Sequence, residues 1–150
     1  MPIVSFPYGK DSVACSIPDS RFKGELVSHM HRFKAESLQE LLVEDALEHP
    51  IGAPALRELA RGKKNIVIIA SDHTRPVPSK IIMPRMLDQI RAGNPDAGIT
   101  ILIATGCHRG TTREELVGKF GEVIVASENI AVHDCDQSEM VNLGKLPSGG

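Results

Sequence analysis

The 150-residue sequence lacks a strong charge excess of either sign, a long apolar run and a rich set of cysteines. Its 17 lysines and arginines stand against 19 aspartates and glutamates, and the net charge of −2 gives no electrostatic reason to bind nucleic acid or an acidic membrane. No apolar run approaches the roughly 20 residues that span a bilayer. We therefore expect neither nucleic acid nor a membrane as a partner.

The three cysteines are too few and too scattered to form a disulfide framework. An odd count favours free thiols in a reducing compartment, and the N-terminus lacks the charged region and cleavage site of a signal peptide. We expect a cytoplasmic protein, in which Cys15 is a small core residue. Zinc-type ligands gather at Cys107, His108, His133, Asp134 and Cys135, but no Cys-x-x-Cys or His-x-x-x-His pair organises them, so we assign no metal ligand.

Alternating strand and helix patterns in the central part of the chain predict an α/β fold. The apolar runs at 65–70 and 99–104 are typical of strands that helices cover on both faces. A helix is predicted over about 81–92, and a second one follows Thr112. We expect a parallel, Rossmann-like layer with flanking helices, which residues 122–125 and 129–132 continue as strands.

Helix ends carry recognisable signals. Thr112 with Glu115 and Ser37 with Glu40 both have capping-box spacing, so each pair predicts a helix start. The helix after Ser37 is expected to reach about residue 47. In the helix over 81–92, Pro84 is expected among the first four residues, whose amide hydrogens have no intrahelical partner.

The N-terminal residues predict a β-hairpin. Two β-favouring runs, 3–8 and 12–17, flank Gly9-Lys10-Asp11, which is a suitable short loop. A short helix is also expected between Pro54 and Gly62. The last eight residues, from Leu143 onward, have no regular pattern, and we expect the chain to stop inside a loop or hairpin.

Polar segments follow the two predicted central strands. They are Ser71-Asp72-His73-Thr74-Arg75-Pro76 and Thr105-Gly106-Cys107-His108-Arg109-Gly110. Ligands bind beyond the carboxyl ends of the strands in an open parallel sheet. Turn formers such as Thr, Gly and Pro are expected there for structural reasons, whereas acid, arginine and histidine together are not. We expect Asp72, Arg75 and His108 to converge on one cleft.

The first segment is suited to an anion. It offers backbone amides, hydroxyls and a guanidinium, although it has neither Walker nor Gly-x-Gly-x-x-Gly spacing. The alternative is that Asp72 caps a turn and pairs with Arg75 at the surface, where such a pair contributes at most about 1 kcal/mol.

His108 is the candidate acid–base group, because an imidazole takes up and returns protons near neutral pH. The alternative is that His108 only hydrogen-bonds a backbone carbonyl in the turn. Arg109 either binds an anion or supports its loop. Asp134 either orients a histidine or belongs to a surface turn.

These segments resemble the N-terminal part of the nickel-dependent lactate racemase family. The resemblance rests on the residues at 71–80, then Ala104-Thr105-Gly106-Cys107-His108-Arg109, then Thr111-Thr112-Arg113-Glu114-Glu115-Leu116, and His133-Asp134. Family members are much longer, and their second half supplies a cofactor-tethering lysine, a nickel-binding histidine and a second catalytic histidine. By resemblance, residues 1–150 are an N-terminal domain that lacks the C-terminal half.

The resemblance implies a racemase or epimerase that interconverts the enantiomers of lactate or a related small 2-hydroxy acid by hydride transfer. Its cofactor would be a nickel pincer nucleotide, pyridinium-3,5-bisthiocarboxylic acid mononucleotide with nickel. Asp72, His73, Thr74 and Arg75 would hold this cofactor, Arg75 would also fix the substrate carboxylate, and His108 would remove the hydroxyl proton. The chain alone is expected to be inactive. The alternative function is a non-catalytic α/β domain that binds a nucleotide or a small organic acid.

Overall fold

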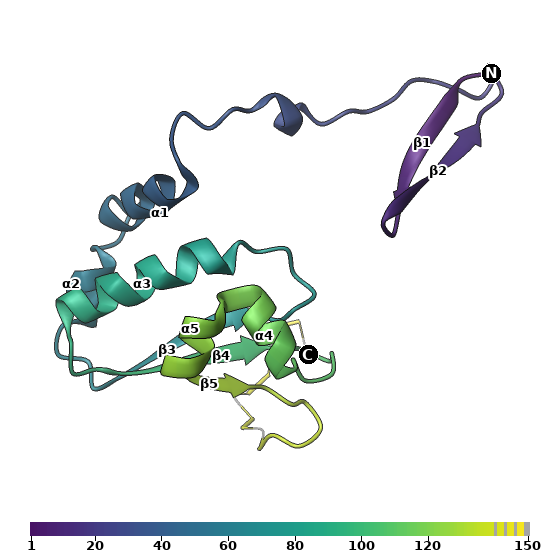
Figure 1. Ribbon diagram of the computed structural model, residues 1–150. Helices are drawn as coiled ribbons and strands as arrows, with labels where there is room; N and C mark the ends of the chain where they lie inside the picture. Colours follow the sequence, from purple (N-terminus) through teal and green to yellow (C-terminus); the bar gives the residue numbers. More distant parts are fainter. Residues whose placement is uncertain (140, 143, 146, 149–150) are drawn as a thin grey trace. The chain divides into compact units, whose positions relative to one another are not determined.

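The computed structural model describes residues 1–139, 141–142, 144–145 and 147–148 (Figure 1). The chain forms two compact units, Met1–Glu36 and Ser37–Gly150. No helix among the described residues is both long enough and apolar enough to cross a membrane.

The first unit contains the predicted hairpin. Strands β1 (Ile3–Tyr8) and β2 (Asp11–Ser16) pair antiparallel, and a 3-10 helix, η1 (His29–Arg32), follows. Tyr8 pairs with Asp11, so the loop is Gly9-Lys10, and the φ of +61° at Gly9 favours glycine. The prediction that Cys15 is a core residue is wrong, because the whole of β2 is exposed and no second layer covers it within this unit.

The second unit is an α/β layer, as predicted. Helices α1 (Gln39–Glu48) and α2 (Leu56–Ala60) lead into a parallel sheet of β3 (Asn65–Ser71), β4 (Gly98–Ala104) and β5 (Asn129–Val132), in that order. Helix α3 (Ser79–Gly93) connects β3 to β4. Helices α4 (Arg113–Phe120) and α5 (Glu122–Ser127) connect β4 to β5.

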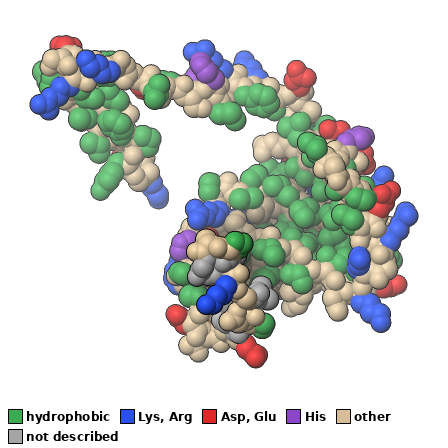
Figure 2. All heavy atoms as spheres, turned by 180° about the vertical axis from the view of Figure 1, so that it is seen from behind, with side chains coloured by type: hydrophobic (Ala, Val, Ile, Leu, Met, Phe, Trp, Pro, Cys, Tyr) green, Lys and Arg blue, Asp and Glu red, His purple; other side chains and the backbone are tan. Residues whose placement is uncertain are grey.

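The core lies on one face of this sheet. Alternate side chains of β3 and β4 join buried residues of α3, α4 and α5 in a single apolar cluster that includes Ile68, Ile101, Leu87, Phe120 and Ile124. On the opposite face of β3, Val67 is 57% exposed and Ile69 is 72% exposed. Figure 2 shows hydrophobic side chains gathered on the surface of this unit. The expectation that helices cover both faces is therefore wrong for the described residues.

Three sequence signals were misleading in detail. Leu38, not Ser37, is the N-cap of α1, and no side chain caps this helix. Residues 122–125 belong to α5 and not to a strand, because Gly121 ends α4 with a φ of +91° and the chain turns directly into another helix that buries only Ile124. Pro84 is the sixth residue of α3, which begins at Ser79. Since proline has no amide hydrogen, the Lys80 carbonyl receives no helical bond from it.

The capping box of α4 is formed as predicted and provides a test of the fold. Glu115 N donates to Thr112 Oγ1 over 3.3 Å, and Thr112 N donates to the Glu115 carboxylate over 2.9 Å. Thr112→Ala should lower the free energy of unfolding in urea by about 1 kcal/mol. The matched control is Ser37→Ala, which removes a capping-box residue that caps nothing and should change stability by less than about 0.5 kcal/mol. Equal losses in the two variants would contradict the assignment.

Candidate active site

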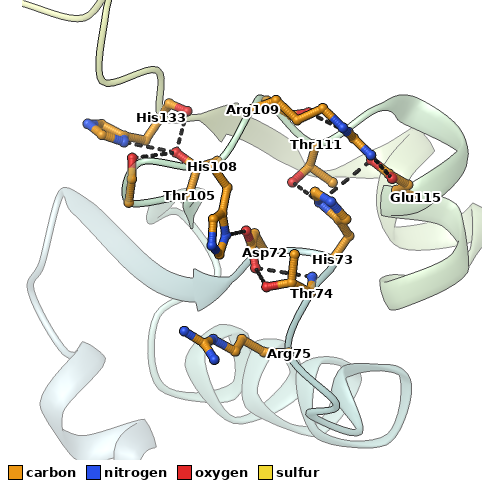
Figure 3. A network of polar contacts seen from close by, with 12 residues as sticks. Asp72, His73, Thr74, Arg75, Thr105, His108, Arg109, Thr111, Glu115 and His133 are labelled. Atoms are coloured by element: carbon orange, nitrogen blue, oxygen red, sulfur yellow. Dashed lines mark hydrogen bonds and ion pairs between the residues drawn. The ribbon is translucent and has the colours of Figure 1, made fainter. Parts of the chain in front are cut away.

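Parallel pairing brings the two polar segments to the same edge of the sheet. Ser71, at the end of β3, pairs with Ala104, at the end of β4. The loops that follow place the Asp72 carboxylate 2.6 Å from His108 Nδ1 (Figure 3). Asp72, Arg75 and His108 line one cavity of about 570 Å³ together with Ser71 and Thr105. The predicted convergence of Asp72, Arg75 and His108 is confirmed.

Asp72 is the buried anion of this site, with 2% of its surface exposed. Its carboxylate accepts hydrogen bonds from the Thr74 amide at 3.1 Å, the Thr74 hydroxyl at 2.7 Å and His108. The hydrogen bond from the Thr74 hydroxyl, followed by the one from His108, holds the pKa of Asp72 far below its usual range, although burial acts in the opposite direction. Asp72 is therefore ionised at neutral pH.

The ionised Asp72 fixes the tautomer of neutral His108. A carboxylate without a proton only accepts hydrogen bonds, so Nδ1 of His108 must be the donor. The lone pair of the neutral imidazole then lies on Nε2. The His108 side chain is 47% exposed, which leaves this nitrogen open to a ligand. The alternative that His108 only binds a backbone carbonyl is wrong, because its partner is a buried carboxylate.

Arg75 has no carboxylate within ion-pair distance among the described residues, so the alternative of an Asp72–Arg75 surface pair is also wrong. Its guanidinium extends on the His108 side of the loop (Figure 3). Lys119, on α4, donates from Nζ to the Arg75 carbonyl over 3.0 Å and so ties the loop to this helix. The cavity therefore presents a free cation beside a free imidazole nitrogen.

His73 lies away from this pair. Its Nδ1 is 3.2 Å from Thr111 Oγ1 and 3.6 Å from the Glu115 carboxylate. Two nitrogens of the Arg109 guanidinium donate hydrogen bonds to the carboxylate of the same Glu115, over 2.6 and 2.9 Å. Of the two predicted roles of Arg109, the structure therefore shows support of its own loop. Hydrogen bonds from Arg109 and then from the Thr112 amide lower the pKa of Glu115 to about 2.

Thr105 is a site residue that sequence reasoning missed. It is 2% exposed, and its hydroxyl donates to the His133 carbonyl over 2.8 Å. A hydroxyl has one hydrogen, so Thr105 Oγ1 accepts from His133 Nδ1 at 3.0 Å, and Nε2 of His133 is left free. Asp134 instead accepts from the amides of Asp136 and Gln137. Of the two interpretations of Asp134, the one that places it in a surface turn is therefore confirmed. The available signal was a threonine directly after a buried strand.

The described residues do not group three His, Cys, Asp or Glu side chains around a common point that would hold a metal ion. We therefore assign no metal ligand to them. The site of this α/β domain combines an oriented imidazole, a guanidinium and a buried carboxylate at the carboxyl edge of a parallel sheet, a set of groups that can contact an anion and transfer a proton.

Comparison with known proteins makes this class more specific. Residues 8–150 match the family described as the lactate racemase N-terminal domain, and the chain belongs to this family. It is 52% identical over 151 residues to a lactate racemase of Thermoanaerobacterium thermosaccharolyticum and 50% identical to one of Lactiplantibacillus plantarum. The alignments cover all of this chain but 35% and 36% of those proteins, so the chain spans about a third of their length.

The fold agrees with a solved relative. The structure of the lactate racemase apoprotein from T. thermosaccharolyticum matches with a TM-score of 0.83 at 50% sequence identity. The match covers 99% of this chain and 34% of that one. The mixed α/β fold class predicted from the sequence is thereby confirmed.

The lowered pKa of Glu115 predicts a pH dependence of stability. Because its pKa is about 2 in the folded protein and ordinarily 4.5, its ionised form stabilises the fold above about pH 4.5, and this contribution is lost as the pH falls toward 2. Glu115→Gln should therefore unfold at lower urea concentration than the parent at pH 7, and the difference should shrink steadily below pH 4.5. Glu48→Gln, which removes a carboxylate with no ion pair among the described residues, is the control. A difference independent of pH would contradict the role of the charge.

Proposed function

We propose that residues 1–150 form the N-terminal domain of a longer racemase or epimerase, which interconverts the enantiomers of lactate or a related 2-hydroxy acid. The observation that carries the proposal is the 2.6 Å hydrogen bond between buried Asp72 and His108. The chain that contains this bond belongs to the family of the lactate racemase N-terminal domain. The chain spans only about a third of its relatives, so catalysis is assigned to the longer protein and the chain alone is expected to be inactive.

His108 is the proposed acid–base group. With Nδ1 donated to Asp72, Nε2 takes the proton of the substrate's 2-hydroxyl as the O–H bond breaks, and the same nitrogen returns that proton when the product alcohol forms. Asp72 holds the ring in one orientation and stabilises the imidazolium that arises after the first transfer, as a buried carboxylate does in other acid–base sites. Asp72 is therefore a positioning residue.

Arg75 is the proposed binder of the substrate carboxylate. A guanidinium matches a carboxylate with two parallel hydrogen bonds. Arg75 lines the same cavity as His108, and its guanidinium is not paired with any carboxylate of the described residues. A substrate held by its carboxylate presents its 2-hydroxyl only one carbon away. This distance suits a base that lines the same cavity.

The proposal includes a nickel pincer nucleotide as the cofactor, and Asp72, His73, Thr74 and Arg75 as the segment that holds it. When bound, such a cofactor supplies an acceptor for the substrate's α-hydride. The side chains at the cavity fit the substrate-facing part of this chemistry, since they bind an anion and move a proton. They offer no ligand set for nickel among the described residues, so we derive no step through the metal.

The odd number of cysteines and their scattered positions support a cytoplasmic location.

The alternative is a domain that binds a nucleotide or small organic acid without catalysis. Its support is the same free guanidinium, which serves binding as well as chemistry. The two functions differ in their demand on His108, because a binding domain does not need an imidazole oriented by a buried anion.

Replacement of the base tests the proposal in the full-length, cofactor-loaded enzyme. His108→Ala should slow interconversion of D- and L-lactate by roughly 10²–10⁴-fold, because the hydroxyl proton loses its acceptor. Asp72→Asn should also slow it, because the amide no longer requires a hydrogen on Nδ1. Chiral chromatography of each lactate enantiomer measures the rate.

The matched control is His49→Ala. His49 Nδ1 lies 3.0 Å from Asp45 on α1, so it is a second histidine–aspartate pair, outside the cavity, and its loss should leave the rate unchanged. Near-normal turnover in His108→Ala would overturn the acid–base role. If His108→Ala retained tight binding of organic acid but no preparation racemised lactate, the binding function would be favoured.

Arg75→Lys tests the carboxylate contact. Lysine keeps the positive charge but loses the planar fork, so we expect KM to rise and kcat to fall together, each by about tenfold. The measurement is steady-state racemisation with lactate, compared with Arg61→Lys at the other end of the sheet. Unchanged kinetics in Arg75→Lys would show that the guanidinium does not hold the substrate.

A further inference from the structure

Two of the three cysteines lie in neighbouring loops at the carboxyl edge of the sheet. Cys107 follows β4 and Cys135 follows β5. Both are free thiols; Cys107 is exposed and Cys135 is partly buried. Cys107 directly precedes His108 and lines the same cavity. The proposed function uses neither thiol.

Hydrogen bonds hold these two loops side by side. Strands β4 and β5 pair in parallel, and the His133 amide extends this pairing by donating to the Ile103 carbonyl over 3.0 Å. Thr105 Oγ1 then contacts both Nδ1 and the carbonyl oxygen of His133 (Figure 3). Cys107 comes two residues after Thr105. Cys135 likewise comes two residues after His133.

Each cysteine lies in a short turn that hydrogen bonds close. The His108 amide donates to the Thr105 carbonyl over 3.0 Å, which closes the turn around Cys107. Cys135 lies in the turn that the Asp134 side chain organises. Neighbouring strands lie about 4.8 Å apart, and a disulfide joins Cα atoms about 4.4–6.8 Å apart. Thiols carried by turns on adjacent strands are therefore within reach of one another.

The two thiols differ in reactivity. Burial, followed by the negative charge of Asp136 and then that of Cys107, raises the pKa of the Cys135 thiol. The contribution of Cys107 agrees with the side-by-side placement of the two loops. Because the thiolate is the reactive form, exposed Cys107 is the thiol that an oxidant attacks first, and Cys135 is suited to react second.

We propose that Cys107 and Cys135 form a reversible disulfide that joins the turn carrying His108 to the loop after β5. The inference goes beyond the proposed racemase activity and does not depend on it. In a reducing compartment such a bond is transient and forms only when an oxidant is present. The oxidant named here is a peroxide.

The reaction proceeds in two balanced steps. The Cys107 thiolate attacks one oxygen of hydrogen peroxide, the O–O bond breaks, and hydroxide leaves and is protonated to water, so that Cys107 becomes a sulfenic acid. Cys135 then loses its proton and its sulfur attacks the sulfur of Cys107. The S–O bond breaks, and the leaving hydroxide takes up that proton as a second water. Two thiols thus lose two electrons in total, and one peroxide is reduced to two waters.

Peptide mapping tests the bond in the purified protein. The chain, at low micromolar concentration, is treated with one equivalent of hydrogen peroxide, alkylated with N-ethylmaleimide and digested with trypsin without reduction. Each cysteine falls in a different tryptic peptide, 11–21, 92–109 or 120–145. Mass spectrometry should show 92–109 joined to 120–145 in at least about tenfold excess over any pair with 11–21, because the adjacent loops give these thiols a high effective concentration. Dithiothreitol should separate the joined peptides.

Serine variants provide the matched control. Cys107→Ser and Cys135→Ser should each abolish the joined peptide. Cys15→Ser, in the other compact unit, should change its yield by less than about twofold. Circular dichroism checks each fold, and the variants of the two exposed residues, Cys107 and Cys15, decide if Cys135→Ser does not fold.

Three results would overturn the proposal. The first is pairing of Cys15 with either partner as often as the two pair with each other. The second is oxidation of Cys107 to a sulfinic acid with no joined peptide. The third is a bond found only between two chains, seen as a dimer on a non-reducing gel.

Discussion

The buried charge of Asp72 is the constraint on which the edge of the sheet depends. A carboxylate that is 2% exposed is costly unless it is hydrogen-bonded, and here three donors from two loops satisfy it. Thr74 comes from the β3 loop and His108 from the β4 loop. Asp72 therefore joins the two loops and orients the imidazole at the same time, so the conformation of the loops and the chemistry of the site have one physical cause.

The parallel register of the sheet places the β3 and β4 loops close enough for Asp72 to connect them. A similar connection joins the β4 and β5 loops. Ser71 pairs with Ala104, and the amide of His133 continues the pairing of β5 by donating to the Ile103 carbonyl over 3.0 Å. Thr105 then joins the β4 and β5 loops through its hydroxyl. The result is two histidines, His108 and His133, each held at Nδ1 by a buried polar group. The carboxylate fixes one ring and the hydroxyl fixes the other.

The sequence predicted what depends on local patterns and on strand ends. Strands β3 and β4 follow from apolar runs, the start of α4 follows from the Thr112–Glu115 spacing, and the meeting of Asp72 with His108 follows from the geometry of parallel sheets. The strand predicted at 122–125 was wrong. The solvent exposure of apolar side chains such as those of Cys15 and Val67 was not predictable, because the sequence of a strand does not show whether another layer covers each of its faces. The Thr105–His133 contact requires the register of β5. The role of Arg109 depends on which of several groups contact the Glu115 carboxylate, namely His73, Arg109 and the Thr112 amide.

The site is organised so that its reactive atoms are the ones left without protein partners. Asp72, Thr74 and Thr105 use their polar atoms on one another and on the two histidines, and all lie in segments anchored to buried strands. Arg75 and His108 line the cavity, and the Arg75 guanidinium and the Nε2 atom of His108 have no hydrogen-bond partner among the described residues. Because the groups behind them are already hydrogen-bonded, a ligand has to reorganise little of the loop structure on binding. Under the proposed function, this preorganisation reduces the free energy that ordering His108 and Arg75 would otherwise cost when a ligand binds.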